Sequence, residues 1–179
     1  MKKIYMIRHC EAEGQSFEAQ LTDRGFKQAV ELADFFSNIK IDRIISSPYL
    51  RAIQSLQPLV ERLNIEIETD QQLIERVLSN KNIPDWFEKL RKTFDDLELK
   101  FEGGESSQEA MKRIVEVVEK VFNSKTENTI IVSHGNLISL LIMYYHKDFG
   151  FEYWQNLSNP DVFLLKNENK LVTYKRLWK

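Results

Sequence analysis

Two arginines and two histidines in three separate segments could together bind and transfer a phosphoryl group. Arg8 and His9 are adjacent near the start of the chain, Arg51 follows a Ser-Ser-Pro sequence, and His134 precedes a glycine. Arginine offers a planar fork of donors that matches phosphate oxygens. A neutral imidazole can attack phosphorus and form a covalent phosphohistidine, and a second imidazole, if protonated, can donate to the phosphoryl oxygens. These residue types suit phosphoryl transfer, which depends mostly on positioning and electrostatic stabilisation.

The segments that carry these residues are predicted to be strands followed by helices. A β-rich or apolar run comes before each one, over residues 3–7, 41–45 and 129–132. In parallel sheets, ligands bind beyond the carboxyl ends of the strands, so we expect the three loops to meet at one edge of the sheet. Helix N-termini at that edge would add oriented N–H groups.

The alternation of strand and helix patterns predicts an α/β fold. A helix is expected over 22–37, with Phe26, Val30, Ala33 and Phe36 available to one face. The other expected elements are a helix with Ser47 as its cap and Pro48 in its first turn, a strand over 65–67, a helix from a capping box at Ser106 to about Phe122, an apolar helix after His134, and a hairpin of 162–165 and 171–174 around 167–169. We predict a three-layer sandwich, with a mostly parallel central sheet flanked by helices and a closing C-terminal hairpin.

Length and composition narrow the class of protein. The 179 residues, of which 42% are hydrophobic and 29% charged, fit one domain over 1–179. A net charge of -2 argues against nucleic acid as a partner. The single cysteine, Cys10, excludes an intrachain disulfide. The first apolar run is broken at Arg8, too early for a signal peptide, and residues 137–145 are too short to span a membrane, so we expect a cytoplasmic protein.

Five segments carry motifs in a recognisable order. They are Arg8-His9-Cys10-Glu11, residues 21–29 (LTDRGFKQA), residues 46–55 (SSPYLRAIQS), Gly104-Glu105-Ser106 and Val132-Ser133-His134-Gly135. Together they resemble the motifs of the histidine phosphatase superfamily, the phosphoglycerate-mutase-like enzymes. The resemblance covers the chain from its start to about residue 145.

This resemblance implies a role for each matching position. His9 would be the nucleophile, and Arg8, Arg51 and His134 would form the phosphate pocket. Glu75 would be the catalytic proton donor, with Glu11, Glu13 and Glu105 as alternatives. The expected substrate-binding residues are Arg8, Gln15, Arg51, Arg76, His134 and Gly135. The resemblance implies no metal or organic cofactor, and residues 76–104 would form an insertion that covers the substrate.

We therefore expect a phosphatase that hydrolyses a small phosphomonoester through a phosphohistidine on His9, without a metal ion. A mutase needs a substantial lid to keep water from its phosphohistidine. Between Glu75 and Ser106 there is room for only about two short helices. Mutase-type phosphoryl transfer stays open as an alternative, and so does a non-catalytic protein that binds a phosphorylated ligand or acts as a scaffold.

Three positions depart from the family pattern. Cys10 replaces the usual glycine, Gln15 stands where many members have asparagine, and Ser79 stands where a glycine often follows the acid. Cys10 would be strained if its position needs a positive φ. A cysteine phosphatase is disfavoured, because Ser16 rather than arginine stands six residues after Cys10. The dispersed histidines disfavour a metal site, and the lack of a Gly-x-Ser-x-Gly elbow disfavours a serine hydrolase.

Overall fold

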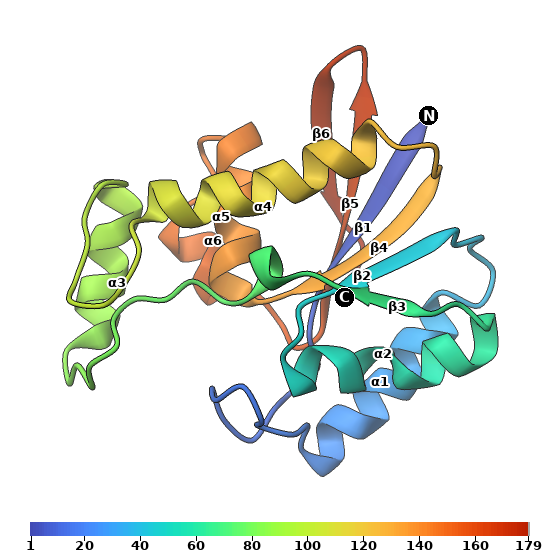
Figure 1. Cartoon of the computed structure of the whole chain (residues 1–179), viewed down its shortest axis with the longest axis horizontal. Coiled ribbons are helices and arrows are strands. Elements are labelled where there is room, and N and C mark those ends of the chain that lie inside the picture. Colours follow the sequence, from blue (N-terminus) through green and yellow to red (C-terminus); the bar gives the residue numbers. More distant parts are fainter. Residues whose placement is uncertain (179) are drawn as a thin grey trace.

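The computed structural model describes residues 1–178, which form a central β-sheet with helices on both faces (Figure 1). In chain order the elements are β1 (Lys2–Arg8), α1 (Asp23–Phe35), β2 (Arg43–Ser46), α2 (Leu50–Leu63), β3 (Ile67–Thr69), a 3-10 turn (Gln71–Leu73), α3 (Trp86–Asp95), α4 (Ser107–Phe122), β4 (Asn128–Ser133), α5 (Gly135–Tyr145), α6 (Phe151–Gln155), β5 (Asp161–Glu168) and β6 (Leu171–Arg176).

The sheet has six strands in the order β3-β2-β4-β1-β5-β6. The pairs β3–β2, β2–β4 and β4–β1 are parallel. β5 pairs antiparallel with β1, and β6 pairs antiparallel with β5. The predicted α/β sandwich, with a mostly parallel sheet and a C-terminal hairpin, is confirmed.

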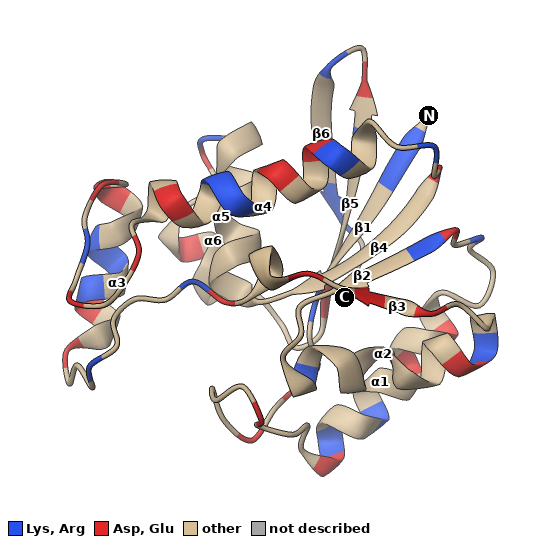
Figure 2. Ribbon diagram, in the orientation of Figure 1, with Lys and Arg blue, Asp and Glu red and all other residues tan. Residues whose placement is uncertain are grey.

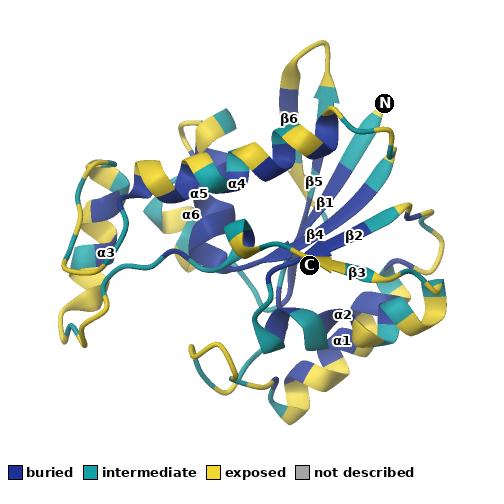
Figure 3. Ribbon diagram, viewed as in Figure 1, coloured by how far each residue is buried: buried dark blue, intermediate teal, exposed yellow. Residues whose placement is uncertain are grey.

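Each face of the sheet has its own hydrophobic core. Ile4 and Met6 of β1 belong to the core under α4 and α5, whereas Tyr5 and Ile7 belong to the core under α1 and α2. This division follows from the alternation of side chains along a strand. Figure 3 shows the buried residues concentrated in the central strands and α5. In the described part of the chain, no helix combines the length and apolar character needed to cross a membrane.

The capping box at the start of α4 has the predicted form. The Ser106 hydroxyl accepts from the Glu109 backbone N–H, and the Glu109 carboxylate accepts from the Ser106 N–H. The helix ends at Phe122, where the pattern placed its end. The apolar run at 129–132 lies within β4 and is buried throughout, as expected for a strand between two layers of helices.

The buried face of α1 differs in part from the prediction. Ala33 and Phe36 are buried as expected, but Phe26 and Val30 are 44% and 45% exposed. The rest of the inward face consists of Gly25, Gln28, Ala29 and Leu32. A Cβ at Gly25 would clash with the carbonyl oxygen of Glu11. The start of α1 therefore approaches the chain after β1 too closely for a large side chain, which the apolar spacing alone did not reveal.

The start of α2 also differs from the prediction. The helix begins at Leu50, and its N-cap is Tyr49, which makes no side-chain capping bond. Ser47 forms a turn before the helix, in which its hydroxyl oxygen accepts from the Tyr49 N–H at 3.3 Å. Ser47 is thus not the cap, and Pro48 lies outside the helix. Arg51 nevertheless falls in the first turn, as expected.

Two boundaries near the sheet edges differ from the prediction. β3 covers 67–69 rather than 65–67, because it pairs with the last three residues of β2. The C-terminal hairpin turns at Asn169 and Lys170, whose φ values are 52° and 68°, rather than over 167–169. A two-residue turn with both φ values positive matches the twist of paired strands, and Asn167 and Glu168 consequently belong to β5.

Residues 76–104 reach away from the sheet and carry one helix, α3, rather than two (Figure 1). The two ends of this segment are joined by backbone hydrogen bonds, from Asn80 N to Glu102 O at 3.1 Å and from Glu105 N to Val77 O at 2.8 Å. The Ser79 hydroxyl also donates to Glu102 O at 2.7 Å. The segment is therefore an extended loop with a closed base.

Candidate active site

Arg8, His9, Arg51 and His134 lie together beyond the carboxyl ends of β1, β2 and β4. The imidazole centroids of His9 and His134 are 5.1 Å apart, and Arg51 Nε lies 3.2 Å from His9 Nε2. His9, Arg51 and His134 are 7%, 1% and 0% exposed. Parallel strands direct their carboxyl ends to one edge, and this is how residues so far apart in sequence meet there.

The hydrogen bonds of His9 determine its tautomer. Nδ1 lies 2.7 Å from the Cys10 carbonyl oxygen, which can only accept, so Nδ1 carries the proton. Nε2 is then the unprotonated nitrogen, and it accepts from Arg51 Nε. Burial, with further contributions from the charges of Arg51 and Arg8, lowers the pKa of His9 to about 3, despite the opposing bond to Cys10. His9 is therefore a neutral imidazole near pH 7, with a lone pair on Nε2.

Arg51 is anchored by the loop that follows β1. Its Nη1 donates to the carbonyl oxygens of Gln15 and Ser16, at 3.1 and 2.9 Å. The guanidinium also lies over the ring of Tyr49, 4.9 Å from its centroid. These contacts hold a buried cation beside His9 without neutralising it, because no carboxylate pairs with it at hydrogen-bonding distance.

Arg8 approaches the same point from the end of β1. Its Nη1 lies 3.4 Å from the carbonyl oxygens of Leu157 and Ser158, while its Nε is buried without a partner. A Cβ at Gly135 would lie 2.9 Å from that Nε. The lack of a side chain at Gly135 therefore leaves room for the Arg8 guanidinium, and this is the role that the structure supports for Gly135.

His134 also has a buried ring nitrogen without a partner. Its Nε2 lies 2.7 Å from the Ser47 hydroxyl oxygen, whereas Nδ1 has no partner. Burial is the main cause that lowers the pKa of His134 well below its usual value, and His9, Arg51 and Arg8 add to it. A buried polar atom without a partner is costly, so an anion that accepts from Arg8 Nε and His134 Nδ1 would satisfy both.

Glu75 stands at the N-terminus of α5. Its carboxylate accepts from the backbone N–H groups of Arg76, Asn136 and Leu137, at 2.8, 3.1 and 2.9 Å. Arg113 of α4 fixes the backbone of residues 72–75, because it donates to the carbonyl oxygens of Gln72, Ile74 and Glu75. The Glu75 side chain is thus fixed in position near the guanidinium groups of Arg8 and Arg51.

The other candidate acids have different partners. Glu11 accepts from the Thr22 hydroxyl at 3.0 Å and lies 3.7 Å from Arg24. Glu105 accepts two bonds from Arg113 and one from the Val77 N–H. Glu13 is exposed. Of the four carboxylates, Glu75 is the one that lines the cavity next to Arg8.

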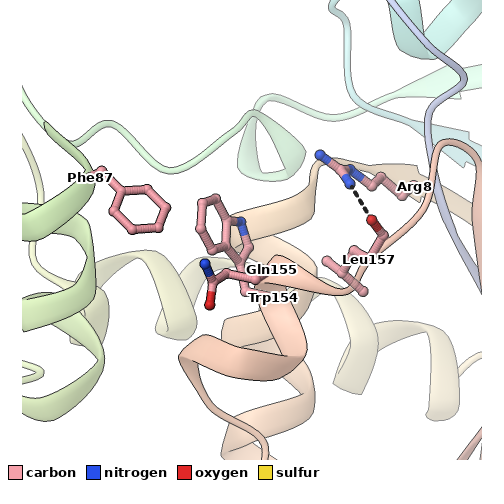
Figure 4. A pocket seen from close by; sticks show the side chains of 5 residues that line it. All are labelled: Arg8, Phe87, Trp154, Gln155 and Leu157. Atoms are coloured by element: carbon pink, nitrogen blue, oxygen red, sulfur yellow. Dashed lines mark hydrogen bonds between the residues drawn. The ribbon is translucent and has the colours of Figure 1, made fainter.

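This cavity has a volume of about 430 Å³ and is lined by Arg8, Gln15, Glu75, Arg76, Leu78, Trp86, Leu90, Asn136 and Trp154. A second hollow of about 290 Å³ shares Arg8 and Trp154 with it. Figure 4 shows the Trp154 ring from α6 lying between Phe87 of α3 and the side chain of Arg8. The cavity thus extends from the phosphate-binding residues toward an aromatic wall.

Arg76 and Gln15 line the cavity in different ways. The Arg76 guanidinium donates through all three nitrogens to protein groups, namely the Glu105 carbonyl and the hydroxyls of Thr93 and Ser107. These four hydrogen bonds use four of its five N–H groups, which argues against the predicted role in substrate binding. Gln15 is exposed and contributes its carbonyl oxygen to Arg51, while its side chain faces the cavity.

Cys10 is unstrained and buried. It is not among the residues with positive φ, so the replacement of glycine carries no backbone penalty. Its side chain is fully buried in the core under α1 and α2. Burial raises the pKa of the thiol to about 12, which argues further against a cysteine nucleophile.

Sequence reasoning missed four residues that shape the site. Ser47 was interpreted as a helix cap, but its hydroxyl forms a hydrogen bond with His134 Nε2. Asn159 donates from Nδ2 to the His9 carbonyl oxygen at 2.9 Å, and no motif marks it. Arg113 lies on a predicted helix to which only packing was assigned, and Trp154 lies on α6, a helix that was not predicted. Within residues 1–178, no group of three or more His, Cys, Asp or Glu side chains is placed to hold a metal ion.

Comparison with known proteins places this geometry in a family. The model of the histidine phosphatase superfamily (branch 1) matches residues 4–176. The chain belongs to the histidine phosphatase superfamily. The family resemblance of the motifs is therefore confirmed, and it extends beyond residue 145 to the C-terminal hairpin.

Two proteins of Hydrogenobacter thermophilus are similar in sequence to this histidine phosphatase. Phosphoserine phosphatase 1 is 27% identical over 147 residues, which is 74% of this chain and 70% of that protein. A protein provisionally named phosphoserine phosphatase 2 is 27% identical over 157 residues, or 79% of this chain and 77% of that protein.

Solved structures show the same fold at lower identity. Mycobacterial glucosyl-3-phosphoglycerate phosphatase is 21% identical and has a TM-score of 0.78, over 98% of this histidine phosphatase and 96% of that chain. The alpha-ribazole phosphatase from Shigella flexneri is 19% identical and has a TM-score of 0.77, over 98% and 95% of the two chains. At this identity the match establishes the fold.

Proposed function

We propose that this histidine phosphatase hydrolyses a small phosphomonoester through a phosphohistidine on His9. The observation that carries the proposal is the arrangement around His9 Nε2. The unprotonated nitrogen lies beside Arg51, and two buried nitrogens without partners belong to the same cluster. Arg8 Nε is a donor, and His134 Nδ1 is one when the Ser47 hydroxyl donates to Nε2 or when the ring is protonated. The names of the similar phosphoserine phosphatases also support hydrolysis.

In the first step, Nε2 attacks phosphorus as the ester P–O bond breaks. The Nδ1–H bond to the Cys10 carbonyl orients the ring for this attack and supports the positive charge that develops on it. Glu75, in its protonated form, gives its proton to the departing oxygen, because an alkoxide leaves with difficulty. To do so, it gives up one of its bonds from the backbone N–H groups of α5.

In the second step, water attacks the phosphohistidine. The Glu75 carboxylate takes a proton from that water, the P–N bond breaks, and inorganic phosphate leaves with His9 neutral again. Arg8, Arg51 and His134 stabilise the negative charge on the non-bridging oxygens in both steps. Phosphate also favours the protonated form of His134, because a nearby negative charge raises the pKa of an imidazole.

The outer part of the molecule favours hydrolysis over mutase-type transfer. Residues 76–104 contribute Leu78, Trp86 and Leu90 to the cavity, which supports a role in covering the substrate. With α3 as its one helix, this segment is a small cover, and water can reach the phosphohistidine.

The buried Cys10 thiol suits a reducing, cytoplasmic compartment.

The test is to trap the intermediate. Rapid acid-free quenching with radiolabelled substrate should give a base-stable, acid-labile label on His9. His9→Ala should lose the label and about 10⁴-fold or more in kcat, a loss typical of removing a nucleophile. His146→Ala is the matched control, because this histidine lies away from the site, with Nε2 against the Val172 carbonyl oxygen. Normal turnover in His9→Ala would refute the mechanism, and a wild-type protein that binds phosphate without turnover would be a binding protein.

A further inference from the structure

We propose that the cavity selects phosphomonoesters whose leaving group is uncharged and carries a planar ring, and that it disfavours leaving groups with a carboxylate. This inference rests on the proposed phosphatase activity and names the class of substrate. It follows from the residues that line the cavity beyond the phosphate-binding end.

The outer wall of the cavity is apolar and aromatic. Trp86 and Leu90 come from α3, Trp154 comes from α6, and Leu78 comes from the segment between them and Glu75. Trp86 is 50% exposed, so its ring is accessible to a ligand. Indole rings bind other planar rings by offset or edge-to-face contact, and they contribute area that a short polar leaving group cannot use.

The Trp154 ring is held in place by its neighbours. Its centroid lies 5.5 Å from that of Phe151, 6.3 Å from Phe87 and 6.5 Å from Phe94. These contacts join the Trp154 ring to α3 and to the start of α6, and Figure 4 shows Phe87 and Arg8 on opposite sides of that ring. A supported ring is pre-organised, and little conformational freedom is lost when a ligand stacks on it.

The two arginines that line the cavity have few N–H groups left for a carboxylate on the leaving group. Arg8 lies at the phosphate-binding end, and Arg76 donates through all three of its nitrogens to the protein. Acidic and basic residues occur together along α3 and α4 (Figure 2), but those that line the cavity are Arg8, Glu75 and Arg76. A substrate carboxylate would therefore find no guanidinium fork free for a bidentate pair, and its desolvation would be poorly compensated.

The test compares four substrates with alkoxide leaving groups, so that the chemistry of departure is similar. They are benzyl phosphate, glycerol 3-phosphate, phosphoserine and 3-phosphoglycerate. We expect kcat/KM for benzyl phosphate to exceed that for each carboxylated ester by about tenfold or more, since one ring contact and one unpaired charge each contribute on that scale. Phosphoserine is a demanding comparison, because it appears in the names of the sequence relatives.

Two variants separate the ring contact from the charge. Trp86→Ala should lower kcat/KM for benzyl phosphate about three- to tenfold and leave glycerol 3-phosphate nearly unchanged. Leu78→Arg, which adds a free cation, should raise kcat/KM for phosphoserine and 3-phosphoglycerate relative to benzyl phosphate. Phe26→Ala is the matched control, because this ring is exposed on α1 away from the cavity.

The outcomes test the phosphatase activity and the substrate class separately. Hydrolysis of none of the four esters would count against the phosphatase activity itself. Hydrolysis in which the carboxylated esters equal or exceed benzyl phosphate would overturn the substrate class and leave the phosphatase activity standing. A Trp86→Ala variant that lowers kcat/KM for all four esters equally would also overturn the substrate class, because the ring would then not discriminate between leaving groups.

Discussion

The two ends of the cavity are built in different ways. At the inner end, His9, Arg51 and His134 are almost fully buried, and hydrogen bonds from loops that follow three strands fix each side chain. At the outer end, Trp86 is half exposed, and α3 is joined to α6 through aromatic rings. Figure 3 shows the same contrast between the buried strands and the exposed α3.

This difference separates recognition of the phosphate from recognition of the rest of the substrate. The register of the sheet sets the inner positions, and hydrogen bonds with strict geometry hold the side chains there. Aromatic contacts at the outer end tolerate small changes in angle and distance. We infer that the outer end can change with the substrate, while the inner end keeps the same phosphoryl chemistry. The predictions below each disturb one end and ask whether the other responds.

After loss of the nucleophile itself, the largest effect is expected for Glu75→Gln, which removes the proposed proton donor at the junction of the two ends. Benzyl phosphate and glycerol 3-phosphate should slow by about 10²–10⁴-fold, the usual contribution of general acid catalysis. p-Nitrophenyl phosphate should slow much less, because p-nitrophenolate leaves with little protonation. The measurement is kcat for each substrate with both proteins. Equal slowing of all three would transfer the acid role to another carboxylate.

Arg51→Ala should lower kcat by about 10²–10³-fold, the typical loss when one electrostatic donor is removed from a site of developing charge. Arg51→Lys should restore only part of this, because an ammonium cannot donate to phosphate and to the Gln15 and Ser16 carbonyls in the same geometry. The ratio of benzyl phosphate to phosphoserine hydrolysis should stay the same in both variants. A changed ratio would show that the inner end also selects the leaving group.

Sequence patterns predicted the inner end well because it depends on strand order. Strands before Arg8-His9 and His134 were evident as buried apolar runs, and a parallel sheet necessarily brings their ends together. The capping box at Ser106 depends on neighbours in sequence and was equally evident. Local and topological rules therefore located the side chains that surround His9, although their catalytic roles stay predictions.

Contacts between distant segments were not predictable in this way. Ser47 looks like a helix cap in sequence, and only the position of His134 in the fold shows that the Ser47 hydroxyl hydrogen-bonds the imidazole. Arg76 looks like a free cation near the acid, but Thr93, Glu105 and Ser107 occupy its donors. The inward face of α1 depends on how closely Gly25 approaches Glu11, which side-chain spacing does not encode. These features require the packing of elements, which periodicity does not determine.

Acid should destabilise the folded protein through the inner end. The folded state holds His9 neutral, with a pKa of about 3, and it lowers the pKa of His134 as well. Unfolded histidines have a pKa of about 6.5, so below that pH the unfolded chain binds more protons than the folded chain. Stability from these groups is therefore complete above about pH 6.5 and is lost as the pH falls toward 3. The expected slope is about 1 kcal/mol per pH unit for each histidine.

Urea unfolding at pH 7.5, 6.0 and 5.0 measures this slope. His9→Asn removes one of the two titrating groups, so its unfolding free energy should depend less steeply on pH. An unchanged slope in His9→Asn would mean that His9 is protonated in the folded state and that its burial does not keep it neutral.

The smallest effect is expected at the outer end, from Phe94→Leu. Phe94 contacts the rings of Phe151 and Trp154, with centroids 5.8 and 6.5 Å away, and so helps to join α3 to α6. Leucine keeps an apolar side chain but loses the ring contacts, which contribute about 0.5–1.5 kcal/mol. Amide hydrogen exchange in α3 should become about three- to tenfold faster, while exchange in α5, which borders the inner end, should not change. Phe26→Leu, an equivalent change on exposed α1, should leave both helices unaffected. Faster exchange in α5 as well would mean that the two ends open together, and the inner end would then depend on the aromatic wall for its rigidity.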